Sequence, residues 1–221
     1  MTLAGLPRRP LSSGAMRYKA VLFDLGGVVV GSPLEAIARY EAEQGIPAGF
    51  VNRVVVATGA AGAWSRLERG ELTLETFYPA FERDCAAAGH TIDARAMMAR
   101  VTEVTVPRPA MLEAIRRIRA RGLLTAAVTN NWITEAQGTG VLRPHFDAFV
   151  ESAVTGVRKP DARIYELACT ALGIEPSEAI MLDDIGANLK TARALGMTTI
   201  RVAHPEVALR ELATLLGFPL G

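Results

Sequence analysis

The stretch LFDLGGVVV, Leu22 to Val30, decides the fold because an apolar run stops at one carboxylate and resumes only after two glycines. Leu22 and Phe23 read as the end of a buried strand, and Asp24 follows them directly. An unpaired buried charge costs on the order of several kcal/mol, so this carboxylate is expected at the exposed tip of its strand. Strand tips are where α/β enzymes place their chemistry, which makes Asp24 the first candidate functional residue.

Composition limits the class of protein. The chain has 221 residues, of which 50% are hydrophobic, and its formal net charge is +1 at pH 7. A nucleic-acid-binding surface needs a basic surplus or a cluster of Lys and Arg, so we expect no nucleic-acid partner. No apolar run approaches the roughly 20 residues that cross a bilayer, so we expect no membrane partner. We expect a cytoplasmic monomer or homodimer.

Cysteine and histidine give no sign of a disulfide or a zinc site. Cys85 and Cys169 are the only cysteines and lie far apart in the sequence, so both are expected to be reduced and structural. The three histidines are scattered. Residues 1–15 contain basic side chains but no apolar stretch, which argues against a secretory signal. We expect them to form a flexible tail.

Beyond Pro107 the sequence alternates helical and strand patterns. The expected elements, starting with a helix, are 111–122, 123–131, 161–173, 179–184, 188–196 and 198–203. In the helix over 161–173, the spacing of apolar residues predicts that Ile164, Leu167 and Leu172 face the core. Strands that alternate with helices of about ten residues indicate βαβ units and a parallel sheet.

Between Ser32 and Val106 the strand pattern disappears. Short helices are expected over 34–45, 48–59, 64–71 and 74–89. The run VVV within the second of these is also compatible with a strand. We therefore predict an α/β core formed by residues 16–31 and 107–221, with residues 32–106 inserted after the first strand as a helical cap over its tip.

Polar side chains end the predicted strands or open the loops beyond them. They are Asp24 in FDLGG, Thr129 in VTNN, Lys159 in GVRKPDARIY, and Asp183 with Asp184 in MLDDIGANLK. Taken singly, each has an ordinary explanation as a turn cap or a solvated loop residue. Because parallel strands end at the same edge of a sheet, we expect these side chains to converge on one crevice.

The residue types of this crevice fit phosphoryl transfer. Only three lysines occur in the chain, so a lysine directly after Arg158 indicates that a compact ammonium is needed there. Mg²⁺ prefers one or two carboxylates, which Asp24 and Asp184 can supply. Lys159 and the metal would offset phosphoryl charge, and Thr129 would hold its oxygens. Asp24 could then attack phosphorus, and water would hydrolyse the resulting aspartyl-phosphate.

These residues and their order resemble those of the haloacid dehalogenase-like (HAD) hydrolases, over nearly the whole chain after Arg17. Within the family, the stretches TAAVTNNW, GVRKPDARIY and LDDIGANLKTARALGM resemble the phosphatase-like N-terminal domain of soluble epoxide hydrolase and the corresponding domain of acyl-CoA dehydrogenase family member ten. The resemblance implies a Rossmann-like parallel sheet with a helical cap inserted after the first strand. It also implies a Mg²⁺ cofactor and a small phosphorylated metabolite as substrate.

The resemblance also implies roles for single residues. It makes Asp24 the nucleophile and Lys159 the residue that stabilises charge. It assigns phosphate binding to Thr129, Asn130, Lys159 and Gly26, the last through its backbone.

For the metal, the resemblance implies Asp24, Asp184 and the backbone carbonyl of Gly26, with Asp183 alongside them. Asp183 would orient Lys159 or a metal-bound water. Asn188 would support the metal shell or the loop.

Gly26 departs from the family pattern, because typical phosphatases of the family place there a second Asp that protonates the leaving group. Three interpretations therefore remain: a phosphatase, which we favour, a metal-free dehalogenase whose carboxylate attacks carbon, and a catalytically weak binding or regulatory domain. A metal-free site gains nothing from the adjacent acids Asp183 and Asp184, which argues against the dehalogenase.

Residues that could contact the substrate and determine its specificity lie in two parts of the sequence. Trp64, Arg66 and Arg69 belong to the predicted cap, and Asn131 and Trp132 follow Thr129. Arg66 and Arg69 are spaced to share a helix face. These side chains either face the pocket or form a solvated cap surface.

Overall fold

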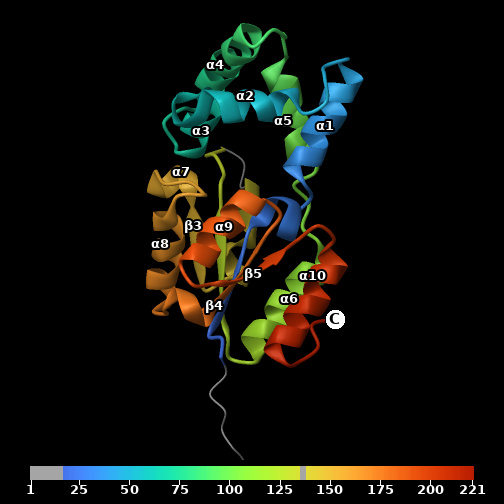
Figure 1. Ribbon diagram of the computed structural model, residues 1–221. Coiled ribbons are helices and arrows are strands. Elements are labelled where there is room, and N and C mark those ends of the chain that lie inside the picture. The colour runs from blue at the N-terminus through green and yellow to red at the C-terminus, as the bar shows by residue number, and fades with distance from the viewer. Residues whose placement is uncertain (1–16, 135–137) are drawn as a thin grey trace, which may run out of the picture.

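The computed structural model describes residues 17–134 and 138–221, and the predicted N-terminal tail lies outside them. Its centre is a parallel sheet with the strand order β3-β2-β1-β4-β5. The strands are β1 Ala20–Phe23, β2 Leu124–Thr129, β3 Ala148–Glu151, β4 Ala179–Asp183 and β5 Thr198–Arg201. Figure 1 labels β3, β4 and β5 of this sheet, which stands between helices. The α/β fold with a Rossmann-like parallel sheet is confirmed.

The central strand β1 is buried on both faces, as is usual for a parallel sheet covered by helices. Val21 and Phe23 pack into one hydrophobic cluster, while Ala20 and Leu22 pack into another. The first cluster lies under α6 (Pro109–Ala120) and α10 (Pro205–Leu216). The second lies under α8 (Ala162–Leu172) and α9 (Gly186–Ala194). The apolar run before Asp24 therefore fixes the strand at the middle of a three-layer core.

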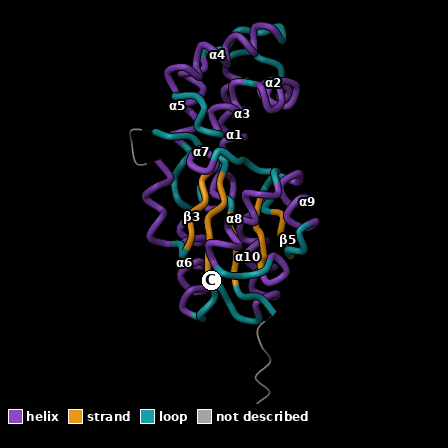
Figure 2. Tube along the Cα trace, turned by 90° about the vertical axis from the view of Figure 1, so that its left-hand side faces the viewer, coloured by secondary structure: helices purple, strands orange, loops and turns teal. Residues whose placement is uncertain are grey.

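A helical block stands over the carboxyl end of the sheet (Figures 1 and 2). Its helices are α1 Pro33–Glu43, α2 Phe50–Thr58, α3 Ala63–Glu68, α4 Leu74–Ala87 and α5 Ala94–Glu103. The block has its own hydrophobic cluster, which contains Phe77, Phe81 and Met97. An isolated antiparallel bridge between Val30 and Pro107 holds together the two chain segments that join the block to the sheet. We call this block, residues 32–106, the cap, and its division from the core remains our proposal.

Short elements complete the fold. They are a π-helical turn at Leu25–Val29, α7 at Ser152–Thr155, and 3₁₀ turns at Gly59–Ala61, Gly138–His145 and Pro176–Glu178. Across the described ranges, every helix is too short or too polar to cross a bilayer.

The structure corrects the sequence prediction at several elements. The run VVV belongs to helix α2, and the predicted elements beyond Pro107 are present. The strand β3 and the helices α5 and α10 were not predicted. The inward orientation of Leu167 is wrong, because this side chain is 42% exposed. Ile164, Tyr165, Ala168 and Cys169 form the buried stripe of α8, and Leu167 lies on the opposite side of the helix.

The two cysteines behave as predicted. Cys85 and Cys169 are both free and buried. Burial raises the pKa of Cys85 to about 12 and that of Cys169 to about 11, so neither forms a reactive thiolate near neutral pH.

Candidate active site

Asp24 lies at the carboxyl tip of β1, where its backbone N–H still donates to the carbonyl of Leu182 in β4 (2.9 Å). Its carboxylate accepts a hydrogen bond from the N–H of Leu25 (2.6 Å), and the residue is 7% exposed. The strand and the turn thus hold this carboxylate in one orientation. Asp24 is therefore held at the carboxyl end of the sheet but is largely shielded from solvent.

The two glycines after Asp24 serve different needs. Gly27 has φ +75°, and a Cβ at this position would lie 2.2 Å from Asp184 Oδ2, so only glycine allows the turn to approach that carboxylate. Gly26 has φ −62° and ψ 128°, which any L-residue adopts. A Cβ on Gly26 would lie 3.1 Å from the ring of Pro33. The conformational requirement therefore belongs to Gly27, whereas Gly26 is limited mainly by a neighbouring side chain.

Lys159 is the central cation of the site. Its side chain is 1% exposed, and its Nζ lies 2.8 Å from Asp24 Oδ2 and 2.7 Å from Asp183 Oδ2. Asn130 holds the lysine backbone on both sides: Oδ1 accepts from the Lys159 N–H (2.8 Å), and Nδ2 donates to the Lys159 carbonyl (3.0 Å). The structure thus brings Asp24, Lys159 and Asp183 together. The side-chain amide of Asn130 bonds the backbone of Lys159, and the role of Asn130 in phosphate binding stays a prediction.

The adjacent acids differ in their surroundings. Asp183 is fully buried and accepts from the N–H of Ile185 (2.8 Å), from Asn188 Nδ2 (3.0 and 3.1 Å) and from Lys159. Both of its oxygens therefore already have partners. Asp184 forms no ion pair with any residue that the structure describes. Carboxylate oxygens of Asp24, Asp183 and Asp184 lie within 4.8 Å of one another.

Charge is unbalanced in this cluster, because three carboxylates surround one ammonium. Burial raises the pKa of Asp24 well above its ordinary value, although Lys159 opposes the shift. Burial and Asp183 together raise the pKa of Asp184 to about 6. Burial would lower the pKa of Lys159, but its two carboxylate partners outweigh this effect and raise it. A divalent cation would relieve the excess of negative charge, and Asp24 and Asp184 offer the oxygen ligands that Mg²⁺ prefers.

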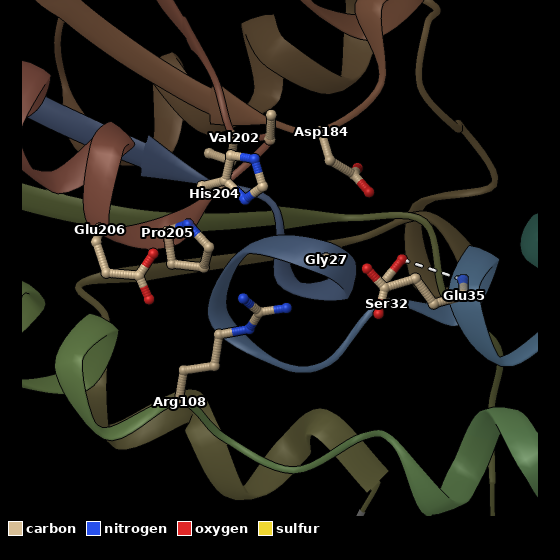
Figure 3. Close-up of a pocket in the computed structure, with 10 residues that line it drawn as sticks. Gly27, Ser32, Glu35, Arg108, Asp184, Val202, His204, Pro205 and Glu206 are labelled. Carbon is tan, nitrogen blue, oxygen red and sulfur yellow. Dashed lines mark hydrogen bonds between the residues drawn. The ribbon is translucent and has the colours of Figure 1, made fainter.

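Asp184 faces a cavity of about 370 Å³ at the side of the site (Figure 3). Gly27 lies at its centre in this view, and Arg108 points into it from below. The guanidinium of Arg108 also donates to the carbonyl of Val30 (3.1 Å), which braces the turn after β1. Ser32 and Glu35 of the cap also line this cavity, so Asp184 faces a space that lies between the cap and the core.

Thr129 ends β2 beside the tip of β1. Thr129 is 3% exposed, and its Oγ1 lies 3.4 Å from the carbonyl oxygen of Asn130. The β1–β2 register pairs Phe23 with Ala127, so Thr129 and Asp24 both lie at the carboxyl edge. This placement is the predicted one, and its role in phosphate binding stays a prediction.

The five candidate substrate-reading residues separate into surface and packing positions. Arg66 and Arg69 both pair with Glu71, at 3.4 and 2.6 Å. The side chain of Arg66 is 43% exposed, which favours the solvated-surface interpretation, whereas that of Arg69 is only 21% exposed. Trp64 is 8% exposed and packs edge-on against Trp132, with ring centroids 6.3 Å apart.

Asn131 also turns away from the site. Its Nδ2 donates to Glu151 Oε1 (2.7 Å), and its backbone N–H donates to Ser152 Oγ (3.0 Å). A further contact, which was not predicted, joins Glu68 of the cap to Arg158 of the core, with 2.6 Å between Oε2 and Nε. Glu68 was missed because an acidic residue in a short polar helix is typical of a solvated surface. The adjacency of Arg158 to Lys159 was the available signal.

Comparison with known proteins identifies the family of the chain. A sequence profile described as haloacid dehalogenase-like hydrolase matches residues 18–196. The chain is 42% identical to acyl-CoA dehydrogenase family member 10 of Mus musculus over 214 residues, which are 94% of this chain and 20% of that protein. It is 35% identical to bifunctional epoxide hydrolase 2 of Sus scrofa, over 93% of this chain and 40% of that protein. The chain thus spans less than half the length of either relative.

A shorter relative and two solved structures extend the comparison. A sesquiterpene phosphatase of Aspergillus oryzae is 25% identical over 90% of this chain and 97% of its own length. A HAD-like hydrolase of Porphyromonas gingivalis shares the fold with a TM-score of 0.67 at 20% identity, covering 90% of this chain and 98% of that one. A HAD enzyme of Bacteroides thetaiotaomicron, solved with magnesium and inorganic phosphate, gives 0.59 at 19% identity, covering 83% and 93%.

Proposed function

The chain belongs to the haloacid dehalogenase-like hydrolases, and from this premise we propose that it is a Mg²⁺-dependent phosphatase of a small phosphorylated metabolite. One observation carries the proposal: Asp24 is held at the sheet edge beside Lys159, within a cluster that has more carboxylates than cations. Phosphatases among the relatives and a magnesium complex among the structural neighbours support the same reaction.

The first half of the reaction is assigned to Asp24. A carboxylate oxygen of Asp24 attacks phosphorus, an O–P bond forms, and the bond from phosphorus to the leaving oxygen breaks. Lys159 holds Asp24 in place and adds positive charge near the phosphoryl oxygens, and Thr129 offers its hydroxyl to them. Mg²⁺ bound by Asp24, Asp184 and the carbonyl of Gly26 would neutralise charge on the phosphoryl group and keep Asp24 ionised.

The second half of the reaction is hydrolysis. Water attacks phosphorus in the aspartyl-phosphate, inorganic phosphate leaves, and Asp24 regains its carboxylate. Asp183 keeps Lys159 oriented throughout, because its oxygens remain bound to Lys159 and Asn188. The leaving group receives its proton from solvent or from the substrate itself, since Gly26 has no side chain to supply one.

The two alternatives make different demands on the same residues. A dehalogenase would use Asp24 to attack carbon and needs no cation, so the cluster with Asp183 and Asp184 argues against it. A weak binding domain would retain phosphate affinity without turnover, and Gly26 is the residue that motivates it. The cytoplasmic location and the monomer or homodimer stay predictions.

Metal-dependent turnover separates these possibilities. We expect the purified protein to hydrolyse an aryl phosphate with Mg²⁺, to lose this activity with EDTA and to regain it when Mg²⁺ is added in excess. Chloride release from 2-chloropropionate that is indifferent to EDTA would instead identify a dehalogenase. Phosphate binding without turnover would identify a binding domain. A panel of phosphorylated metabolites would then identify the substrate.

A further inference from the structure

Lys159 and its neighbour Arg158 are held by different parts of the molecule. The Lys159 ammonium pairs with Asp24 and Asp183 in the core. The Arg158 guanidinium reaches helix α3 of the cap, where its Nε donates to Glu68 Oε2 (2.6 Å) and its NH1 donates to Ser65 Oγ (3.2 Å). Adjacent residues thus join the candidate active site to the cap.

The cap side of this contact is buried. The Glu68 side chain is 9% exposed, and Ser65 is 1% exposed. The second carboxylate oxygen of Glu68 accepts from Trp64 Nε1 (3.0 Å), so both oxygens have partners. A buried carboxylate that loses its paired cation is strongly disfavoured, so Glu68 is expected to keep its ion pair with Arg158. The pair is therefore a fixed attachment point between cap and core.

Two further contacts dock the same part of the cap. Gly70 approaches the core so closely that a Cβ there would lie 2.3 Å from the carbonyl oxygen of Ala153 in α7. Trp64 packs on Trp132, three residues beyond Thr129. Figures 1 and 2 both place α3 next to α7. The α3 region therefore contacts the loops that present Thr129 and Lys159.

We propose that Glu68 and Arg158 are positioning residues, through which docking of the cap fixes Lys159 for phosphoryl transfer. This inference rests on the proposed function. Lys159 has little freedom to compensate for a shift of Arg158, since Asn130 holds its backbone at 2.8 and 3.0 Å. Its ammonium lies 2.8 Å from Asp24, at the distance of a charge-assisted hydrogen bond whose strength depends on its alignment.

The test compares Glu68→Gln, Arg158→Met and the double variant with Glu71→Gln. Glu71 lies in the same segment but pairs with Arg66 and Arg69 at the surface, so it controls for a lost charge. We expect kcat for an aryl phosphate to fall about tenfold or more in each single variant, with KM changed little. The double variant should be no slower than Arg158→Met, because both changes break one contact. Arg158→Lys should recover part of the loss.

A readout without activity separates this inference from the proposed function. Hydrogen exchange of the backbone at residues 156–160 should increase in Glu68→Gln and stay unchanged in Glu71→Gln. The only two tryptophans of the chain lie at this contact, so intrinsic fluorescence should change in the same variants. Ser65→Ala removes a single hydrogen bond and serves if Glu68→Gln does not fold.

The outcomes are distinct. Increased exchange in Glu68→Gln, together with a reduced kcat, supports the positioning role. Unchanged hydrogen exchange at 156–160 overturns it, whatever the enzyme's activity. Losses of kcat that add up in the double variant also overturn it. A wild-type protein without metal-dependent phosphatase activity refutes the proposed function instead. The positioning role in phosphoryl transfer is then refuted as well, even if the exchange data show that the cap is attached through Arg158.

Discussion

Two buried charge networks lie next to each other and differ in their balance. Around Lys159, Asp24 and Asp183 share one ammonium and Asp184 lies beside them without an ion pair, whereas around Arg158 a single carboxylate faces one guanidinium. A balanced buried pair is complete in itself, but an excess of buried negative charge is stable only with an added cation or a bound proton. The balance of the Arg158 network fits a structural role, whereas the excess of carboxylates around Lys159 agrees with the cation site that we propose.

The largest expected effect comes from Asp24→Asn. The substitution preserves the shape of the side chain but removes the negative nucleophile, so turnover should fall by at least about 10⁴-fold. The free energy of unfolding should not fall, because the change reduces the excess of carboxylates. Steady-state kinetics and urea unfolding measure the two quantities. Turnover close to wild type in a folded variant would rule out the covalent mechanism.

Lys159→Met tests the same network from the opposite side. It leaves Asp24 and Asp183 without their cation, so the metal-free protein should lose about 3–5 kcal/mol of its free energy of unfolding. Saturating Mg²⁺ should restore part of this loss, because the cation then balances the carboxylates. Lys190→Met is the matched control, since Lys190 is exposed, and it should be neutral. Equal destabilisation with and without Mg²⁺ would contradict the proposed charge balance.

Asp184→Asn should stabilise the metal-free protein at pH 8. The pKa of Asp184 is raised to about 6 from 3.8, so the folded state disfavours its charged form. After allowance for partial exposure, the variant should gain about 1–2 kcal/mol. The wild type should recover this difference as the pH falls from about 6 to 4, because its folded state then takes up the proton more readily than its unfolded state.

Addition of Mg²⁺ should reverse the order of stability, so that the wild type becomes more stable than Asp184→Asn. The wild type keeps both candidate carboxylate ligands, whereas Asp184→Asn should need more Mg²⁺ for half-maximal activity. Unfolding curves at several pH values, with EDTA or Mg²⁺, measure both effects. Asp161→Asn is a suitable control, because Asp161 pairs with Arg163 at the surface. If Asp184→Asn is no more stable than the wild type at pH 8 in EDTA, the ionised carboxylate of Asp184 does not destabilise the folded state as expected.

The sheet and the carboxylates at its edge were predictable because both follow from strong local patterns. Buried parallel strands read as apolar runs, and a charge that ends such a run marks the strand tip. The edge strand β3 was missed because its four residues are largely half-buried and carry no such run. Leu167 was misplaced because spacing alone leaves the centre of a helix's buried face uncertain by about one residue.

Long-range contacts explain what else the sequence left open. The role of Asn130 as a clamp depends on Lys159, which lies 29 residues away in the chain, and Glu68 meets Arg158 across 90 residues. No local pattern encodes such pairs. Likewise, the sequence showed two adjacent glycines without indicating that only Gly27 needs a positive φ.

The smallest expected effect concerns Gly26. Without an acid at this position, aryl and acyl phosphates, whose leaving groups are stable anions, should react far faster than simple alkyl phosphates. Gly26→Asp should improve alkyl phosphates selectively. The backbone accepts the change, since φ is −62°, but the new Cβ meets the Pro33 ring at 3.1 Å, so the ring must move by a few tenths of an ångström. We therefore expect a gain of about tenfold, which is below the range of about 10²–10⁴-fold of a well-placed acid.

The measurement is kcat/KM across phosphate esters of graded leaving-group pKa, for the wild type and for Gly26→Asp. A steep dependence in the wild type that becomes shallower in the variant supports the absence of a general acid. Gly26→Ala introduces the same contact with Pro33 without a carboxyl group, so any change it shows is steric. A flat dependence in the wild type would mean that another group already supplies the proton. The turn after Asp24 would then be complete as it stands, and Gly26 would serve the site only through its backbone carbonyl.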